Sequence, residues 1–319
     1  MLSALRQDIA AFEVIVVDDA SVDRTRVIIE EILAREEFSG RLVRTIFHER
    51  NQGVLAAVNA AMAMATGEIF LMMAGDDISM PNRLRRTAAI FEKNPKVQLV
   101  YGEVEIIDEK GRLLRPVRSK GRAKQSAYSF LRYGRIYAGA LPCGASAAYR
   151  RRLYDVFGPM GAGPHAEDNC YWIRALLLGA IHHDPACFVQ WRRHGANLSN
   201  FHATSEADWR SRQLSFMSNH ARMSPQWLTD VATAREKGLI SPLRAFQVRY
   251  AARKEDATWA LWCSSMRPDP WSQWTRLAWG MVLIGRLTTT LNMLKLRASR
   301  SEREKKWQEL VKLKSNPAA

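Results

Sequence analysis

The 319-residue sequence has few cysteines and no long apolar run. Its four cysteines, Cys143, Cys170, Cys187 and Cys263, form no CxxC pair, which argues against a zinc knuckle or a dithiol redox site and favours reduced thiols. A stretch of about 20 apolar residues is missing, so we expect no membrane-spanning helix. The chain also opens without the pattern of a secretory signal, and we therefore expect a cytoplasmic protein.

Negative charge is scarce relative to positive charge. The sequence holds 47 Lys and Arg against 32 Asp and Glu, a formal net charge of +15. Such a surplus suits a polyanionic partner: a nucleotide diphosphate, an anionic membrane surface or nucleic acid. Because no zinc spacing, aromatic-rich RNA motif or helix-turn-helix pattern accompanies the charge, we do not expect nucleic acid as a partner.

Strand-like and helix-like patterns alternate over the first two thirds of the chain. We predict strands at 13–17, 42–47, 68–73, 98–101, 139–149 and 186–192, helices at 25–35, 54–65, 81–93 and 167–178, and a loop at 110–126. This alternation predicts an α/β fold with a mainly parallel sheet and helices on both faces. From about residue 205 the pattern is helical only, so we expect a domain at 1–204 and a basic helical extension at 205–319.

Two acidic pairs follow predicted strands. Asp18-Asp19 ends the strand at 13–17, and Asp76-Asp77 follows the strand at 68–73. Ligands of open parallel sheets bind beyond the carboxyl ends of the strands, which is where these pairs fall. Adjacent carboxylates repel each other, and a hard divalent cation such as Mn²⁺ or Mg²⁺ would relieve the repulsion and bridge them to a diphosphate. The alternative is a pair of polar turns, with Asp77 capping the next helix.

Two later positions also offer chemistry. Glu167-Asp168 stands at the start of a predicted helix, where Asp168 is either a general base for a hydroxyl group or a helix cap stabilised by the helix dipole. His194 lies in a turn rich in Gly and Asn, and is either a metal or diphosphate ligand or a solvated loop histidine.

Taken in order, several segments resemble the motifs of family-2 glycosyltransferases. They are Glu13–Asp23, Asn51–Gly53 with Asn59–Ala61, Thr66–Leu84 with its Gly75-Asp76-Asp77, Glu167–Arg174 and Arg192–Ser199. The resemblance covers roughly residues 1–200 and depends on the order and spacing of all the pieces. It implies a GT-A-type fold, followed here by the helical extension, and a transferase that moves a sugar from a nucleotide-sugar donor to a glycan or lipid-linked acceptor.

The same resemblance implies roles for individual residues. Asp19 would hydrogen-bond the nucleotide base, and Asp76 would lie at the ribose and diphosphate side. Asp77 would ligate Mn²⁺ or Mg²⁺, and His194 would complete the metal or diphosphate contacts. Asp168 would be the catalytic base of a single displacement that inverts the anomeric carbon.

The sequence departs from the family pattern at its start. Family members begin with one further strand, which would lie between the strands at 13–17 and 68–73, and this sequence opens inside the helix that follows it. We therefore expect the domain to lack its first strand. This leaves a second hypothesis open, a non-catalytic protein that binds a nucleotide sugar or a partner.

The C-terminal extension carries a Trp-rich and Arg-rich stretch at 271–296. Rings and basic side chains of this kind suit an in-plane helix on an anionic membrane surface, here the inner face of the cell membrane. The alternative is that this face packs on the catalytic domain.

Overall fold

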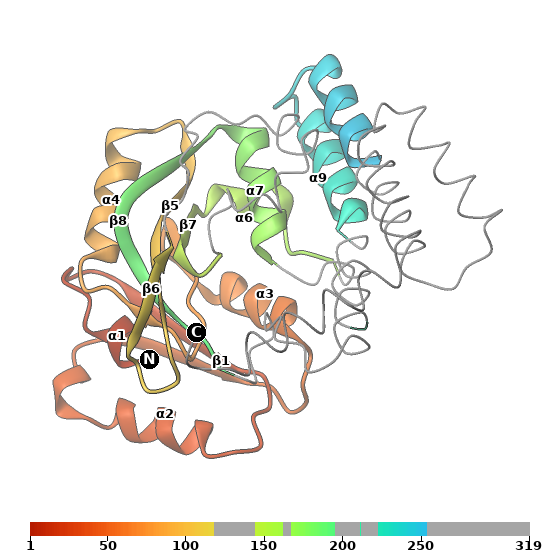
Figure 1. Cartoon of the computed structure of the whole chain (residues 1–319). Coiled ribbons are helices and arrows are strands. Elements are labelled where there is room, and N and C mark those ends of the chain that lie inside the picture. The colour runs from red at the N-terminus through yellow and green to blue at the C-terminus, as the bar shows by residue number, and fades with distance from the viewer. Residues whose placement is uncertain (118–143, 162–166, 195–210, 212–222, 254–319) are drawn as a thin grey trace, which may run out of the picture.

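The computed structural model describes residues 1–117, 144–161, 167–194, 211 and 223–253 (Figure 1). The helices are α1 (Leu2–Leu5), α2 (Thr25–Leu33), α3 (Val54–Met64), α4 (Arg83–Lys93), α6 (Arg152–Phe157), α7 (Glu167–Leu178) and α9 (Ser224–Glu236). The strands are β1 (Glu13–Asp18), β2 (Leu42–Phe47), β3 (Ile69–Leu71), β4 (Ile78–Ser79), β5 (Val97–Ile107), β6 (Leu113–Val117), β7 (Ala147–Arg150) and β8 (Ala180–Arg192).

The predicted α/β architecture is confirmed, but the sheet is mixed rather than mainly parallel. The β1–β2 and β5–β8 pairings are parallel, whereas β7 runs antiparallel to both β3 and β5, and β4 and β6 run antiparallel to β8 and β5. The alternation of strands and helices predicts parallel neighbours only where a helix crosses over between them. Here β7 enters between β3 and β5 in the reverse direction, and mixed sheets of this kind are common in α/β folds.

The segment expected as a loop at 110–126 contains strand β6, so that prediction is wrong in its first part. A tight turn reverses the chain after β5: Asp108 accepts the N–H groups of Lys110 and Arg112 at 2.9 and 2.8 Å, and Gly111 takes a φ of 83°. Glycine adopts this left-handed conformation without a steric penalty, so a hairpin forms. Residues 118–126 lie outside the described part of the chain.

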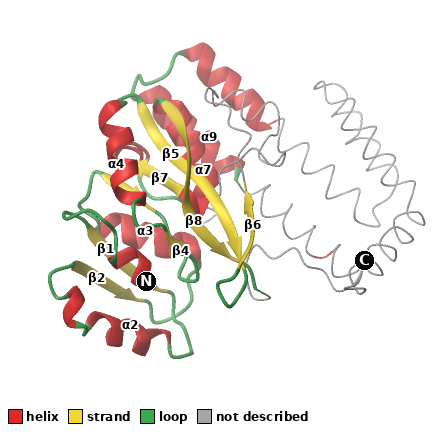
Figure 2. Cartoon of the chain, turned by 60° about the vertical axis from the view of Figure 1, so that its left-hand side comes forward, coloured by secondary structure: helices red, strands yellow, loops and turns green. Residues whose placement is uncertain are grey.

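Helices cover both faces of the larger sheet (Figure 2). Alternate side chains of a strand point to opposite faces, and β5 follows this rule. Leu99 and Tyr101 are buried in a cluster with residues of α7 and α9, while Val100 is buried with Phe91 of α4. The burial of β5 along nearly its whole length is therefore explained by packing on two sides.

The strands form two separate sheets. One is the pair β1–β2, and the other has the order β3-β7-β5-β8-β4 with β6 on β5. A cavity of about 550 Å³ lies between β1 and β3, lined by Ile15 and Val17 of β1, Ile69 and Leu71 of β3, and apolar residues of α3. The sheet is thus interrupted at the position where the family resemblance places a further strand.

The hydrophobic core continues into the region beyond residue 205. Trp227, Val231 and Ala234 of α9 are buried in one cluster with the apolar residues of α7, and Val248 in the helical segment 242–253 joins them. The first described part of the expected extension is therefore packed on the α/β domain. Residues 271–296, where we expect membrane contact, lie outside the described residues, and among the described residues no helix is long and apolar enough to cross a membrane.

Candidate active site

The carboxylate of Asp19 sits just beyond the end of β1 and is held by donors from the next strand and loop. Its Oδ1 lies 2.8 Å from His48 Nδ1 and accepts the Gln52 N–H at 2.9 Å, while its Oδ2 accepts the Gly53 N–H at 2.6 Å. Burial pushes the pKa of Asp19 upward, but these hydrogen bonds outweigh that effect and hold the pKa below its ordinary value. Asp19 is therefore fixed as a carboxylate.

The backbone around Asp19 is bent sharply. Ala20 has a φ of 63°, a left-handed conformation that costs a non-glycine residue roughly 1–2 kcal/mol. On the facing loop Gly53 has a φ of 88°, which glycine accepts readily, and it precedes the first turn of α3. Strain of this kind persists where the surrounding structure enforces it, and it gathers at functional sites.

Asp76 and Asp77 meet the carboxyl end of β8. Asp77 Oδ1 accepts the backbone N–H of Arg192 at 2.9 Å, and the Arg192 guanidinium donates from Nε to the carbonyl of Asp76 at 2.8 Å. His194 Nε2 lies 3.0 Å from Asp76 Oδ2. The structure thus brings together Asp76, Asp77 and His194, as the sequence predicts. His194 contacts Asp76, and Arg192, the last residue of β8, bonds to both acidic residues.

Asp77 is a desolvated carboxylate with one oxygen left over. Its side chain is buried, and among the described residues Oδ2 has no hydrogen-bond partner. Burial raises its pKa to about 6; the Arg192 N–H opposes this, and the charge of Asp76 adds to it. The alternative in which Asp77 only caps α4 is not what the structure shows, because the N-cap residue of α4 is Asn82 and the N–H of Leu84 in its first turn is accepted by Gln7 Oε1 at 3.2 Å.

An orphaned carboxylate oxygen of this kind fits a hard divalent cation. Among the described residues no group of three or more His, Cys, Asp or Glu side chains could enclose a metal ion. Mg²⁺ is usually held by one or two carboxylates together with substrate phosphates, so a full cage of protein ligands is not needed. Asp77 Oδ2 is the atom that would hold the cation.

Glu167 and Asp168 form the first turn of α7. Burial and the neighbouring Asp168 charge raise the pKa of Glu167 to about 7. Burial likewise raises the pKa of Asp168, although Asp168 Oδ1 accepts the N–H of Asn169 at 2.7 Å. A carboxyl group with a raised pKa is a better proton acceptor at neutral pH than an ordinary aspartate.

The position of Asp168 depends on a glycine. A Cβ built on Gly144 would lie 2.7 Å from both the Cβ and the Oδ2 of Asp168, so any other residue there would displace the carboxylate. Gly144 starts the short 3-10 turn Gly144–Ser146 that leads into β7. The close approach of this turn to the first turn of α7 fixes one side of the carboxylate.

Sequence reasoning missed two of these residues, His48 and Gly144, and it also missed the hydrogen bonds of Arg192 to Asp76 and Asp77. His48 could have been found, because the carboxyl ends of the parallel strands β1 and β2 meet at one edge. Gly144 carries no local signal, because its role comes from a contact with a residue 24 positions away. Asp19, Asp77 and Asp168 stand in three separate sets of contacts, and the structure records no direct contact among them within its described residues.

The mixed sheet, its covering helices and the acidic groups at its edge define an α/β fold of the GT-A type. The structure of TarS residues 1–349 from S. aureus, in complex with UDP, matches it with a TM-score of 0.50 over 94% of this chain and 86% of that chain, at 18% identity. Residues 1–157 match the family model of Glycosyl transferase family 2, and the chain belongs to this family.

Two similar curated proteins are named as glycosyltransferases. An uncharacterized glycosyltransferase of Nostoc sp. is 29% identical over 215 residues, which are 66% of this chain and 65% of the relative. The Escherichia coli UDP-Glc:alpha-D-GlcNAc-diphosphoundecaprenol beta-1,3-glucosyltransferase WfgD is 33% identical over 106 residues, 33% of this chain and 39% of that protein. The chain thus spans less than two thirds of the length of either relative.

Proposed function

We propose that this chain transfers a sugar from a nucleoside-diphosphate donor to a glycan or lipid-linked acceptor, with inversion and with a need for Mn²⁺ or Mg²⁺. The observation that carries the proposal is the buried Asp77, whose Oδ2 has no hydrogen-bond partner among the described residues. The E. coli relative, whose name gives a UDP-sugar donor and a lipid diphosphate acceptor, supports the substrate classes.

Each acidic site has a distinct task in this reaction. Asp77 would hold the cation, with Asp76 and His194 beside it, and the cation would offset the charge of the leaving diphosphate. Asp168 would take the proton from the acceptor hydroxyl while the new bond to the anomeric carbon forms and the bond to the diphosphate breaks. A single displacement from the opposite side inverts that carbon.

Asp19 is suited to contact the nucleotide. A carboxylate offers about four acceptor positions, and His48, Gln52 and Gly53 use three of them. A further position therefore remains for an N–H of the nucleotide base, in agreement with the role that the family resemblance implies. Because Asp19 stays ionised well below neutral pH, this acceptor is present throughout the physiological range.

Calorimetric titration tests the proposal. UDP should bind in the presence of Mn²⁺ and bind about 10- to 100-fold more weakly without it, since one interaction of a charged group contributes roughly 1.5–3 kcal/mol. The variant Asp77→Asn should lose the effect of Mn²⁺, whereas Asp155→Asn, at an exposed i,i+4 pair with Arg151, should keep it. Tight Mn²⁺-dependent binding in Asp77→Asn would contradict the assignment.

The second candidate is a protein that binds a nucleotide sugar without transferring the sugar. It is favoured by the cavity between β1 and β3, because this gap separates the strand that bears Asp19 from the sheet that bears Asp77. The two candidates differ in turnover. Release of nucleoside diphosphate from a panel of nucleotide sugars, with product configuration read by NMR, supports the transferase; binding without release supports the second candidate.

A further inference from the structure

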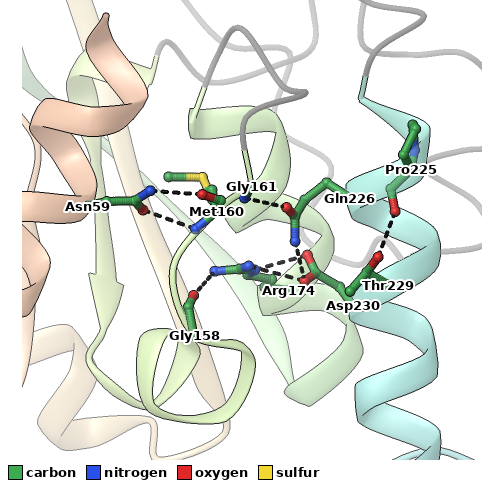
Figure 3. Close-up of polar contacts among 9 residues, drawn as sticks. All are labelled: Asn59, Gly158, Met160, Gly161, Arg174, Pro225, Gln226, Thr229 and Asp230. Atoms are coloured by element: carbon green, nitrogen blue, oxygen red, sulfur yellow. Dashed lines mark hydrogen bonds and ion pairs between the residues drawn. The ribbon is translucent and has the colours of Figure 1, made fainter. Parts of the chain in front are cut away.

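The backbone of residues 158–161 is held by side chains from three helices (Figure 3). Asn59 of α3 makes two hydrogen bonds to Met160: its Nδ2 donates to the carbonyl at 2.8 Å, and its Oδ1 accepts the N–H at 3.0 Å. Gln226 of α9 accepts the N–H of Gly161 through Oε1 at 2.8 Å. Two successive residues are thus fixed by helices that are far apart in the sequence.

A buried ion pair completes this cluster. The side chains of Arg174 on α7 and Asp230 on α9 are 0% and 1% exposed, and the guanidinium donates from Nε and Nη2 to the two carboxylate oxygens at 2.9 and 3.1 Å. Arg174 Nη1 donates to the carbonyl of Gly158 at 2.8 Å, and Gln226 Nε2 donates to Asp230 Oδ1 at 2.9 Å. One connected network therefore links α7, α9 and the segment 158–161.

Stability alone is a weak explanation for this network. Burial raises the pKa of Asp230, and the charge and hydrogen bonds of Arg174 and the hydrogen bond of Gln226 oppose this shift. Apolar residues of similar volume often replace such buried pairs at no loss of stability. What apolar residues cannot supply is the fixed geometry of several directional hydrogen bonds to backbone groups.

Two of the helices in the network begin at or directly after residues of the candidate active site. Helix α3, which carries Asn59, begins directly after Gly53, whose N–H binds Asp19. Helix α7, which carries Arg174, begins with Glu167 and Asp168. Helix α9 lies beyond the residues that the family model matches.

We propose that Asn59, Arg174, Gln226 and Asp230 are positioning residues, which set the first turn of α7 and its Asp168 relative to the nucleotide side of the site. The inference rests on the proposed transferase function. A general base must lie within hydrogen-bond reach of the proton that it removes, and a misplacement of about 1 Å can cost roughly 10²-fold in rate. Gln226 and Asp230 of α9 thus act on the site indirectly, through their contacts with Gly161 and Arg174.

The variants Asn59→Ala and Gln226→Ala test the proposal, because each frees one of two adjacent backbone positions. We expect kcat to fall about 10- to 100-fold in each, with affinity for UDP and Mn²⁺ kept within about twofold. If both act by releasing the same segment, the double variant should lose little more than either single one. The matched control is Thr229→Ala on α9, whose hydroxyl donates to the carbonyl of Pro225 in the same helix at 3.0 Å.

Hydrogen exchange gives a readout that does not need turnover. The amides of Gly161 and Asn169 should exchange at least about tenfold faster in Gln226→Ala and at the wild-type rate in Thr229→Ala. A wild-type protein without turnover on any nucleotide sugar would contradict the proposed function, while the exchange rates would still decide the positioning. A lower Tm with unchanged kcat and unchanged exchange at these two amides would overturn the positioning role.

Discussion

The carboxylate at the end of β1 and the carboxylate near the end of β8 meet opposite conditions. Three donors from the protein surround Asp19, and its pKa lies below the ordinary value. Asp77 is buried with one oxygen unpartnered among the described residues, and its pKa rises to about 6. The protein supplies three hydrogen bonds to the Asp19 carboxylate, whereas it leaves one oxygen of the buried Asp77 carboxylate without a hydrogen bond among the described residues.

The first turn of α7 resembles Asp77, because its carboxyl groups are also buried and have raised pKa values. Burial raises the pKa of both Glu167 and Asp168, and the first of these reaches about 7. Perturbed values of this kind are typical of groups that exchange a proton or bind a cation during function. The contrast therefore separates Asp19, a carboxylate whose charge the protein itself stabilises, from Asp77 and Asp168, which we expect to bind a cation and to accept a proton.

The largest expected effect is on turnover in Asp168→Asn. Removal of a general base costs roughly 10²- to 10⁴-fold, so kcat should fall by that factor while donor affinity stays nearly the same. The measurement is nucleoside diphosphate release at saturating donor, together with calorimetric binding. A collapse of donor affinity would instead make Asp168 a binding or capping residue, and the contrast with Asp19 would disappear.

A smaller effect is expected from pH. A raised carboxyl pKa means that the base is protonated and inactive below the raised value and ionised above it. We therefore expect kcat to rise as the pH passes through the raised pKa of Asp168 and to level off above it. An ordinary aspartate, with a pKa of about 3.9, would give a flat profile between pH 5 and 8. Such a flat profile in wild-type protein would argue against a buried base.

The smallest effect concerns stability, and its sign differs between the two sites. The folded-state pKa of Asp77 is raised from 3.8 to about 6, so its charge destabilises the fold increasingly as pH rises through this window and fully above it. Asp77→Asn should therefore stabilise the protein at pH 7, by on the order of 1–3 kcal/mol, and should not do so below pH 4.

Asp19→Asn should do the reverse. The substitution removes the charge that His48, Gln52 and Gly53 stabilise, and it should cost on the order of 1–3 kcal/mol at pH 7. Urea denaturation of both variants across pH 4–8 measures the two changes in the free energy of unfolding. Equal changes of one sign would show that the electrostatic contrast between the sites has no thermodynamic consequence.

Much of the fold was predictable from periodicity and turn chemistry. The patterns at 25–35, 54–65 and 81–93 became α2, α3 and α4 within two residues at each end, and the helix at 167–178 has the predicted bounds. These are segments in which local propensity and tertiary packing agree. Strand direction was not predictable in the same way. The direction of β7 relative to its neighbours depends on where it enters the sheet, between β3 and β5, and not on its own residues.

The residues of the site likewise fall into those that local sequence predicts and those that depend on contacts between distant segments. Asp19, Asp76 and Asp77 could be singled out because they follow buried strands, and Asp168 because it begins a helix. The tasks of Gly144, Asn59 and Asp230 depend on contacts between distant segments, with separations of 24, 101 and 56 residues. Composition and spacing carry no record of such contacts in a single sequence.

The cavity between β1 and β3 has a mechanical consequence. Within the described residues, no ladder of backbone hydrogen bonds joins the pair β1–β2 to the larger sheet, and the cavity of about 550 Å³ lies at this junction. Pressure favours states in which voids of this kind are eliminated. Under rising hydrostatic pressure the pair β1–β2 should therefore separate from the larger sheet first, and Asp19 would leave the active site before the groups around Asp77 are disturbed.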